Sequence, residues 1–201
     1  EHGIDYELCG KVIVATNKDE TERLGAILER GKANGVNCSI ISGERLREIE
    51  PHATGLEAIH VPECGIVNYE QVCQKLGELL TKGSSHQIHF GEEVLEIESS
   101  KDGLVVQTTE LSICCQRLIN CAGLHSDRLT KLGGQTPGAK IIPFKGEYYF
   151  LSKDAEKLCK HLIYPVPDPK FPFLGVHFTR MIEGGVECGP NAVLAFGREA
   201  Y

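Results

Sequence analysis

The sequence lacks any hydrophobic run long enough to cross a membrane. Its longest unbroken apolar stretches are about five residues, as in Ala192–Phe196, whereas a transmembrane helix needs roughly 18. It also lacks a basic excess, because its formal net charge is −7 and its pI is about 5.6. Nucleic-acid binding needs a positive face that replaces the counterions of the phosphates. We therefore expect no transmembrane segment and no nucleic-acid partner, and peripheral membrane association stays open.

The sequence also lacks the spacings of a metal or disulfide framework. Its nine cysteines are an odd number, are irregularly spaced and include no C-x-x-C pair. His86 and His89 form an H-x-x-H pair, but on the strand that we predict there, residues three apart face opposite sides. We therefore expect no metal site, and reduced, mostly buried thiols in an intracellular compartment.

Three glycine motifs are absent as well. The chain contains no G-x-G-x-x-G, no G-x-x-x-x-G-K-[ST] and no G-x-S-x-G, so it does not supply a dinucleotide loop, a P-loop or a nucleophile elbow. The chain starts at Glu1, and its only methionine is Met181. We therefore expect either a processed leader or a missing upstream segment.

The first 83 residues alternate short strands and helices. Lys11–Ala15 reads as a buried strand, and a helix is expected after Asp19, ending near Gly35. Ser42 is a candidate N-cap for a short helix that Pro51 stops. A second candidate N-cap is Asn68, with Gln71 in the capping-box position. The helix after it carries an apolar stripe and ends at Gly83; the stripe consists of Val72, Leu76, Leu79 and Leu80.

After residue 87 the pattern becomes that of β-strands. Asp102-Gly103 predicts a hairpin turn, and Leu118–Cys121 is apolar enough to be a central strand. The other expected strands are 88–98, 104–108, 111–115, 140–151, 161–166, 173–180 and 186–190. The order is mixed α/β, then a helix and meander, then an antiparallel sheet, which indicates the α/β (α+β) class.

Four stretches carry residues typical of a cofactor and substrate site. They are Ile119–Asp127 (INCAGLHSD), Pro143–Tyr148 (PFKGEY), Ile163–Asp168 with Phe173–Thr179 (IYPVPD, FLGVHFT), and Gly189–Ala192 (GPNA). In this order and spacing they resemble the D-amino-acid-oxidase-like flavoproteins, the glycine and sarcosine oxidase group. Gly65–Tyr69 (GIVNY) and Val193–Phe196 (VLAF) fit the same family. The resemblance spans the whole chain, which corresponds to the middle of a family protein.

The resemblance implies a fold and a cofactor. Residues 65–135 would form the second part of a Rossmann-like FAD-binding domain, whose N-terminal dinucleotide-binding βαβ unit is missing. Residues 1–64 and 136–201 would form a mostly antiparallel substrate domain. The positions expected at FAD are Glu93, Val94, Cys121, Ala122, Gly123, Gly189 and Pro190. At the 121–123 turn, a buried strand that ends in Ala-Gly brings backbone amides close to a ligand without side-chain obstruction. Ser126 or Asp127 would cap the helix that follows. An ordinary strand-to-helix turn is the structural alternative.

The resemblance also implies an activity, the FAD-dependent oxidation of L-2-hydroxyglutarate to 2-oxoglutarate, with electrons passing to a quinone or another acceptor. A base of near-neutral pKa suits this reaction, and His177, in a strand beside a Tyr- and Pro-rich loop, is the candidate. Candidate substrate-binding residues are Lys145, Tyr148, Tyr164, Thr179, Arg180 and Asn191. Lys145 stands where family members often carry arginine, and Arg180 faces away from Thr179 by strand alternation. An animal-type family member of this kind would be mitochondrial.

Two alternatives remain open at the level of sequence. One is an amine-oxidising relative of the glycine and sarcosine oxidase type. The other is a catalytically inactive fragment that acts only as a binding module, which the missing glycine loop favours. For each site residue, a packed side chain without a chemical role is the structural alternative.

Overall fold

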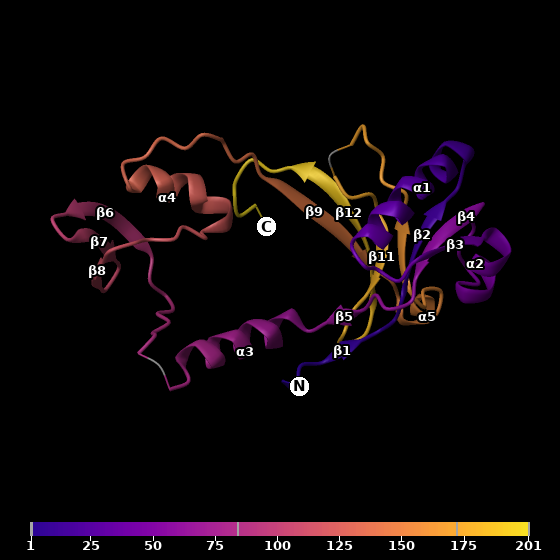
Figure 1. Ribbon diagram of the computed structural model, residues 1–201, viewed down its shortest axis with the longest axis horizontal. Helices are drawn as coiled ribbons and strands as arrows, with labels where there is room; N and C mark the ends of the chain where they lie inside the picture. Colours follow the sequence, from indigo (N-terminus) through magenta and orange to yellow (C-terminus); the bar gives the residue numbers. More distant parts are fainter. Residues whose placement is uncertain (1, 84, 172, 201) are drawn as a thin grey trace. The chain divides into compact units, whose positions relative to one another are not determined.

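The computed structural model describes residues 2–83, 85–171 and 173–200 (Figure 1). The chain forms two compact units. Unit 1 comprises Glu1–Leu76 and Gly146–Val193, and unit 2 comprises Gly77–Lys145 and Leu194–Tyr201. The change of unit falls inside α3 (Tyr69–Thr81) and inside β9 (Phe144–Phe150). The predicted domain boundaries at 64/65 and 135/136 stay predictions.

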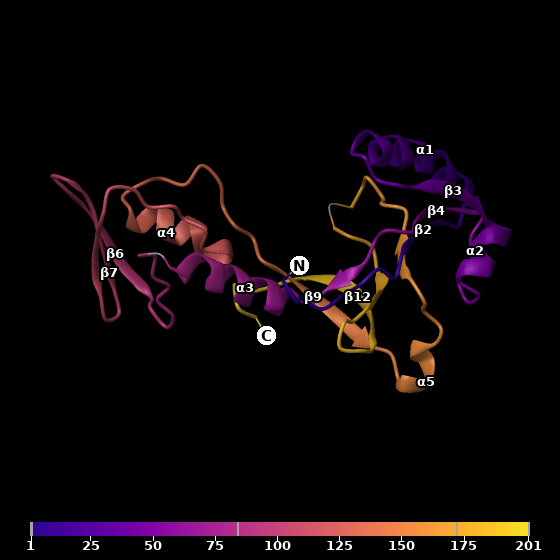
Figure 2. The same cartoon turned by 60° about the horizontal axis from the view of Figure 1, so that its bottom comes forward.

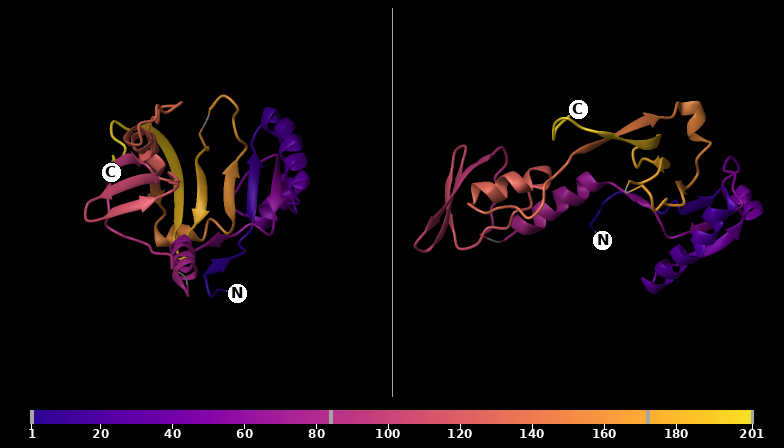
Figure 3. Two further views of the ribbon diagram at one scale, coloured as in Figure 1. Left: turned by 60° about the vertical axis from the view of Figure 1, so that its left-hand side comes forward. Right: turned by 90° about the horizontal axis from the view of Figure 1, so that it is seen from above.

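Unit 1 is built on a seven-stranded sheet of order β3-β4-β2-β10-β11-β12-β9 (Figure 3). Besides β9, its strands are β2 (Lys11–Ala15), β3 (Ser39–Ser42), β4 (Glu57–Val61), β10 (Leu162–Pro165), β11 (His177–Arg180) and β12 (Val186–Leu194). The pairs β3–β4, β4–β2, β10–β11 and β11–β12 are antiparallel, and β2–β10 is parallel. The expectation of a mostly antiparallel sheet is confirmed.

Strand β2 is the centre of the core because both of its faces are covered. Val12 points to one face and packs with Leu46 of α2 (Gly43–Ile49). Ala15 points to the other face and packs with Leu24 of α1 (Lys18–Ala33) and with Ile59. All five residues are at most 1% exposed, and full burial of one leucine contributes about 1.5–3 kcal/mol. The two helices therefore flank the β2–β4 part of the sheet (Figure 2).

The helices begin where local capping chemistry directs them. Ser42 Oγ accepts the Arg45 N–H at 3.2 Å, which confirms the predicted cap of α2. Asn68 Oδ1 accepts the Gln71 N–H at 3.1 Å, which confirms the cap of α3. The reciprocal bond of a capping box is not made, because the Gln71 side chain binds the backbone N–H and the carboxylate of Asp5, each at 2.7 Å. A capping-box residue thus fastens the N-terminal segment to α3.

The apolar stripe of α3 is not buried. Leu76, Leu79 and Leu80 are 55%, 50% and 55% exposed, and none of the residues of α3 is buried. The helical periodicity predicted the helix correctly, but periodicity by itself does not provide the surface that a stripe packs against.

Unit 2 contains a three-stranded antiparallel sheet of β6 (Val94–Ser100), β7 (Gly103–Thr108) and β8 (Ser112–Cys115), with α4 (Ser126–Leu132) packed beside β6 (Figure 2). The hairpin at Asp102-Gly103 is confirmed. Strand β6 begins six residues later than predicted, and residues 86–93 form no strand. The alternation argument against His86 and His89 therefore does not apply. Among the described residues no group of three or more His, Cys, Asp or Glu side chains is placed to hold a metal ion.

Two further expectations are wrong. The segment Leu118–Cys121 forms no strand, and Ile119 is 84% exposed. A central strand needs a partner on each side, and no described strand pairs with this segment. The thiols are free but not mostly buried, since only Cys9 and Cys159 are buried, while three of the nine are exposed.

The remaining elements are short. Strand β1 (Tyr6–Glu7) pairs antiparallel with β5 (Ile66–Val67), and α5 (Lys153–Glu156) precedes β10. No helix within the described ranges combines the length and the apolar character needed to cross a bilayer.

Candidate functional site

His177 opens strand β11, and its side chain is held by the segment just before that strand. The residue is 6% exposed, and its Nδ1 lies 2.8 Å from the carbonyl oxygen of Gly175. A carbonyl only accepts hydrogen bonds, so this contact requires a proton on Nδ1 and leaves a lone pair on Nε2 in the neutral ring. The predicted base therefore has a defined tautomer with a proton-accepting nitrogen.

Tyr164 lies against His177 from the neighbouring strand β10. The two rings stack, with centroids 4.1 Å apart and planes at 17°. Burial raises the pKa of the Tyr164 phenol, and a hydrogen bond with the Thr179 side chain offsets part of the rise. His177 and Thr179 are two residues apart on β11 and share one face. This face therefore presents an imidazole next to a neutral phenol and a hydroxyl.

The structure adds a residue that sequence reasoning did not single out, Lys11. Its Nζ lies 3.6 Å from the centroid of the Tyr164 ring. Because His177 already covers one face of that ring, the ammonium lies over the other. Burial lowers the pKa of this half-buried lysine, and the nearby Cys64 opposes the shift. The stretch KVIVA predicted only a strand, and the available signal was a charged residue at the edge of a buried apolar run.

Tyr148 of β9 joins the same face through Gly189. Gly189 pairs with His177 across β11 and β12, so the space of its missing side chain lies beside the imidazole. The Tyr148 ring fills that space, with Cδ1 2.6 Å from where a Cβ of residue 189 would lie. Five residues of unit 1 thus gather on one side of the sheet, and we call them the Tyr164 face: Lys11, Tyr148, Tyr164, His177 and Thr179.

Of the other three predicted substrate residues, Arg180 and Lys145 lie off the Tyr164 face, and Asn191 is bound by Glu147. Arg180 donates to both carboxylate oxygens of Glu7, at 2.6 and 3.1 Å, and lies on the opposite side of β11 from Thr179. The Asn191 amide donates to a carboxylate oxygen of Glu147 at 3.4 Å. Lys145 is exposed on the part of β9 that belongs to unit 2, at an odd offset from Tyr148.

The 121–123 turn in unit 2 fits the close approach of a cofactor. Asn120 holds it by accepting the Ala122 N–H at 3.1 Å and donating to the Ser126 carbonyl at 2.8 Å. Gly123 has a φ of +52°, and no heavy atom lies within 4 Å of the place of a Cβ, so the backbone there is open on that side. The 3-10 helix Gly123–His125 follows, and Ser126 and Asp127 lie inside α4 rather than at its N-cap, which is His125, contrary to expectation.

At the other expected cofactor positions, backbone groups are engaged by neighbouring residues or covered on one side. The Glu93 N–H donates to Thr109 Oγ1 at 2.9 Å, and the Glu93 carbonyl accepts the Thr109 N–H at 3.0 Å. Val94 is paired with Thr108 in the sheet. Gly189 is covered by Tyr148, and Pro190 Cβ lies 3.1 Å from the place of a Cβ at Gly146. Within the described residues, the 121–123 turn is thus the predicted cofactor position whose surroundings are open.

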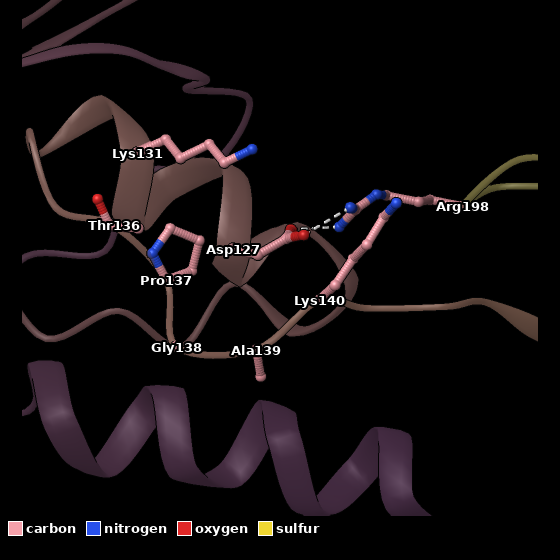
Figure 4. Close-up of a pocket in the computed structure, with 8 residues that line it drawn as sticks. All are labelled: Asp127, Lys131, Thr136, Pro137, Gly138, Ala139, Lys140 and Arg198. Atoms are coloured by element: carbon pink, nitrogen blue, oxygen red, sulfur yellow. Dashed lines mark hydrogen bonds and ion pairs between the residues drawn. The ribbon is translucent and has the colours of Figure 1, made fainter.

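Unit 2 also contains a cavity of about 540 Å³ near α4 (Figure 4). It is lined by Asp127, Lys131, Thr136, Pro137, Gly138, Ala139, Lys140 and Arg198. Arg198 Nη2 donates to Asp127 Oδ2 at 2.8 Å, and its Nη1 binds the other carboxylate oxygen. This guanidinium lowers the pKa of Asp127 to about 2. Sequence reasoning missed the pair because 71 residues separate its members.

Comparison with known proteins places the chain in a family. Residues 1–200 match the family described as FAD dependent oxidoreductase. L-2-hydroxyglutarate dehydrogenases from Indibacter alkaliphilus and Escherichia coli K12 are 48% and 45% identical over the whole chain, and the human mitochondrial one is 43% identical. The chain spans about half the length of these relatives, namely 51%, 48% and 46%. Relatives of the same name are thus bacterial as well as mitochondrial, so they do not determine a compartment.

Solved structures agree on the fold. L-α-glycerophosphate oxidase from Mycoplasma pneumoniae aligns with a TM-score of 0.79 at 23% identity, covering 98% of this chain and 53% of that chain. Glycine oxidase from Geobacillus kaustophilus aligns with a TM-score of 0.74 at 18% identity, covering 96% and 50%. The chain belongs to the FAD dependent oxidoreductase family, as the stretches around residues 119–127 and 163–179 predicted.

Proposed function

We propose that the protein oxidises L-2-hydroxyglutarate to 2-oxoglutarate, with FAD as its cofactor. The proposal is supported by the names of relatives that are 43–48% identical over the whole chain. The structural observation that carries it is the His177 tautomer, because the contact with the Gly175 carbonyl leaves Nε2 with a lone pair that can accept a hydroxyl proton.

The Tyr164 face supplies the acid–base part of this reaction. Oxidation of a 2-hydroxy acid breaks the O–H bond and the Cα–H bond, and His177 Nε2 accepts the hydroxyl proton. The neutral Tyr164 phenol, held by Thr179, orients the substrate as a hydrogen-bond donor. FAD, when bound, supplies the acceptor for the Cα hydrogen and its electron pair. Of the residues present, the 121–123 turn would hold part of this cofactor.

The remaining parts of the proposal concern acceptor and location. The electrons pass on to a quinone or another acceptor rather than to oxygen, and a eukaryotic source would place the protein in mitochondria. Incubation of the reduced protein with a quinone analogue or with oxygen, followed at the flavin absorbance band, separates these acceptors. Reoxidation by oxygen at the same rate as by the quinone would contradict the acceptor assignment.

The test uses the protein expressed from its complete reading frame. With a dye acceptor, we expect reduction with L-2-hydroxyglutarate and none with the D isomer. The His177→Gln variant should lose roughly 10²–10⁴-fold in kcat, the usual contribution of a general base, while retaining its flavin. The exposed His52 provides the control, and His52→Gln should keep wild-type activity.

Two results would reject the proposed activity, and a third would reject the assigned base. Turnover of glycine or sarcosine without turnover of L-2-hydroxyglutarate would indicate an amine-oxidising relative. A colourless protein that takes up no FAD would indicate a binding module. An active His177→Gln variant would remove His177 from the mechanism.

A further inference from the structure

Lys11 is a half-buried cation without a carboxylate partner among the described residues. Arg180 and Arg198 differ from Lys11 in this respect, because each has a carboxylate partner. Arg180 pairs with Glu7, and Arg198 pairs with Asp127. Burying a charge costs free energy unless an opposite charge or a ligand compensates it. Contact with the Tyr164 ring compensates part of this cost, because the face of an aromatic ring attracts a cation. The donors of the ammonium group remain available to an anion.

The position of Lys11 relative to the candidate base suits a substrate with two separated polar ends. Lys11, Tyr164 and His177 lie on the adjacent strands β2, β10 and β11. Adjacent strands are about 4.8 Å apart, so the backbones of the outer two are separated by roughly 10 Å. A ligand that lies across the three strands on the Tyr164 face therefore meets the ammonium of Lys11, the phenol of Tyr164 and the imidazole of His177, in that order.

The cation that a dicarboxylic substrate requires is not supplied by the residues predicted for it. Arg180 is engaged by Glu7 on the other side of β11, and Lys145 lies three residues from Tyr148 on β9, an odd offset that turns its side chain away from the Tyr148 side. Lys11 is the cation on that face, and its compact ammonium matches a carboxylate that is bound at one point.

We propose that Lys11 binds the distal carboxylate of a dicarboxylic 2-hydroxy acid whose hydroxyl lies at His177, and that it thereby sets the preference for dicarboxylic over monocarboxylic acids. This inference rests on the proposed function, because it assigns the hydroxyl end of the substrate to His177. It adds a specificity-determining residue for which no sequence motif gave a signal.

The test compares two substrates of equal carbon number in the protein expressed from its complete reading frame. L-2-hydroxyglutarate carries the distal carboxylate, and L-2-hydroxyvalerate does not. Lys11→Met should lower kcat/KM for L-2-hydroxyglutarate about 10- to 100-fold, the effect of losing a charged hydrogen bond, and leave L-2-hydroxyvalerate within about twofold. Lys11→Arg should retain part of the preference. Lys32→Met, at an exposed position of α1, is the matched control and should behave as wild type.

A binding measurement keeps this test independent of turnover. By calorimetry, 2-oxoglutarate should bind Lys11→Met at least about 10-fold more weakly than wild type, and 2-oxovalerate should bind both equally. Melting temperature and flavin content verify the fold, and Lys11→Gln replaces Lys11→Met if the latter does not accumulate.

The outcomes separate the two proposals. If wild type oxidises L-2-hydroxyglutarate and Lys11→Met does so equally well, the role of Lys11 is overturned and the proposed function stands. An equal loss with both substrates also overturns it, because that marks a structural effect. If wild type does not oxidise L-2-hydroxyglutarate but binds 2-oxoglutarate through Lys11, the proposed function fails and the role of Lys11 stands. Failure of both binding and turnover overturns both.

Discussion

Substitution of Glu50 tests how a buried carboxylate holds unit 1 together. Glu50 is 0% exposed at the end of α2. Its Oε1 accepts the Lys160 N–H at 2.8 Å, contacts His161 Nδ1 at 2.8 Å, and also accepts the His161 N–H. One oxygen atom therefore joins α2 to a segment 110 residues away that leads into β10.

The expected loss follows from the groups left without an acceptor. Glu50→Ala deprives two backbone N–H groups and one imidazole nitrogen of their partner, and each buried unsatisfied group costs about 1–3 kcal/mol. Because Lys160 is exposed and His161 half-buried, water replaces part of the loss, and we expect about 3 kcal/mol in total. For a chain of this size, 1 kcal/mol changes Tm by about 2–4 °C, so Tm should fall by roughly 6–12 °C.

Differential scanning calorimetry of three variants checks this reasoning. Glu50→Gln retains an accepting oxygen and should lose about 1 kcal/mol. Glu48→Ala removes a carboxylate from the same helix that is exposed and paired with Arg45, and it should change stability by less than about 0.5 kcal/mol. If Glu50→Ala melted at the same temperature as Glu48→Ala, the hydrogen bonds to Glu50 would not be holding α2 in place.

Three further predictions concern other parts of the molecule. Because Arg198 lowers the pKa of Asp127 to about 2 from an ordinary 3.8, the pair stabilises the fold above about pH 4 and its contribution is lost as the pH falls toward 2. Melting curves of Asp127→Asn and wild type should therefore differ above pH 4 and converge near pH 2, and a constant difference would contradict the pairing. Leu46→Ala should lower the free energy of unfolding by about 2–5 kcal/mol, measured by chemical denaturation, and Leu79→Ala should lower it by less than about 1 kcal/mol. The reason is that Leu46 is buried and Leu79 is exposed, so equal losses would show that α3 is covered. Tyr164→Phe keeps the ring but removes the donor, so kcat/KM for L-2-hydroxyglutarate should fall about 10-fold with an unchanged Tm; full activity would show that the hydroxyl does not touch the substrate.

The starts of α2 and α3 were predictable because their causes are local. Ser42 and Asn68 cap helices through bonds to residues three positions later, and such bonds depend on short-range sequence. The Asp102-Gly103 hairpin is predictable for the same reason. Where the partner is distant, prediction failed. Gln71 binds Asp5 instead of closing a capping box, and Leu118–Cys121 has the composition of a central strand without a strand beside it.

The candidate site was predicted in part. His177, Tyr164, Thr179 and Tyr148 lie on one face of the sheet, although their roles stay predictions. The alternation of β11 correctly separated Arg180 from Thr179, because a strand has a fixed period of two. Whether Arg180 was available to a ligand depended on Glu7, a residue 173 positions away.

The sequence by itself determined the family, the mixed α/β class, the caps of α2 and α3 and the side of β11 on which each residue lies, since these follow from local chemistry and from the order of the motifs. Only the tertiary structure decided which cations are neutralised and which are available. Strand order places Lys11 over the Tyr164 ring, and the pairing of β2 with β10 is set by packing between segments some 150 residues apart. Electrostatic compensation depends on distance in space, which the order of residues along the chain does not specify.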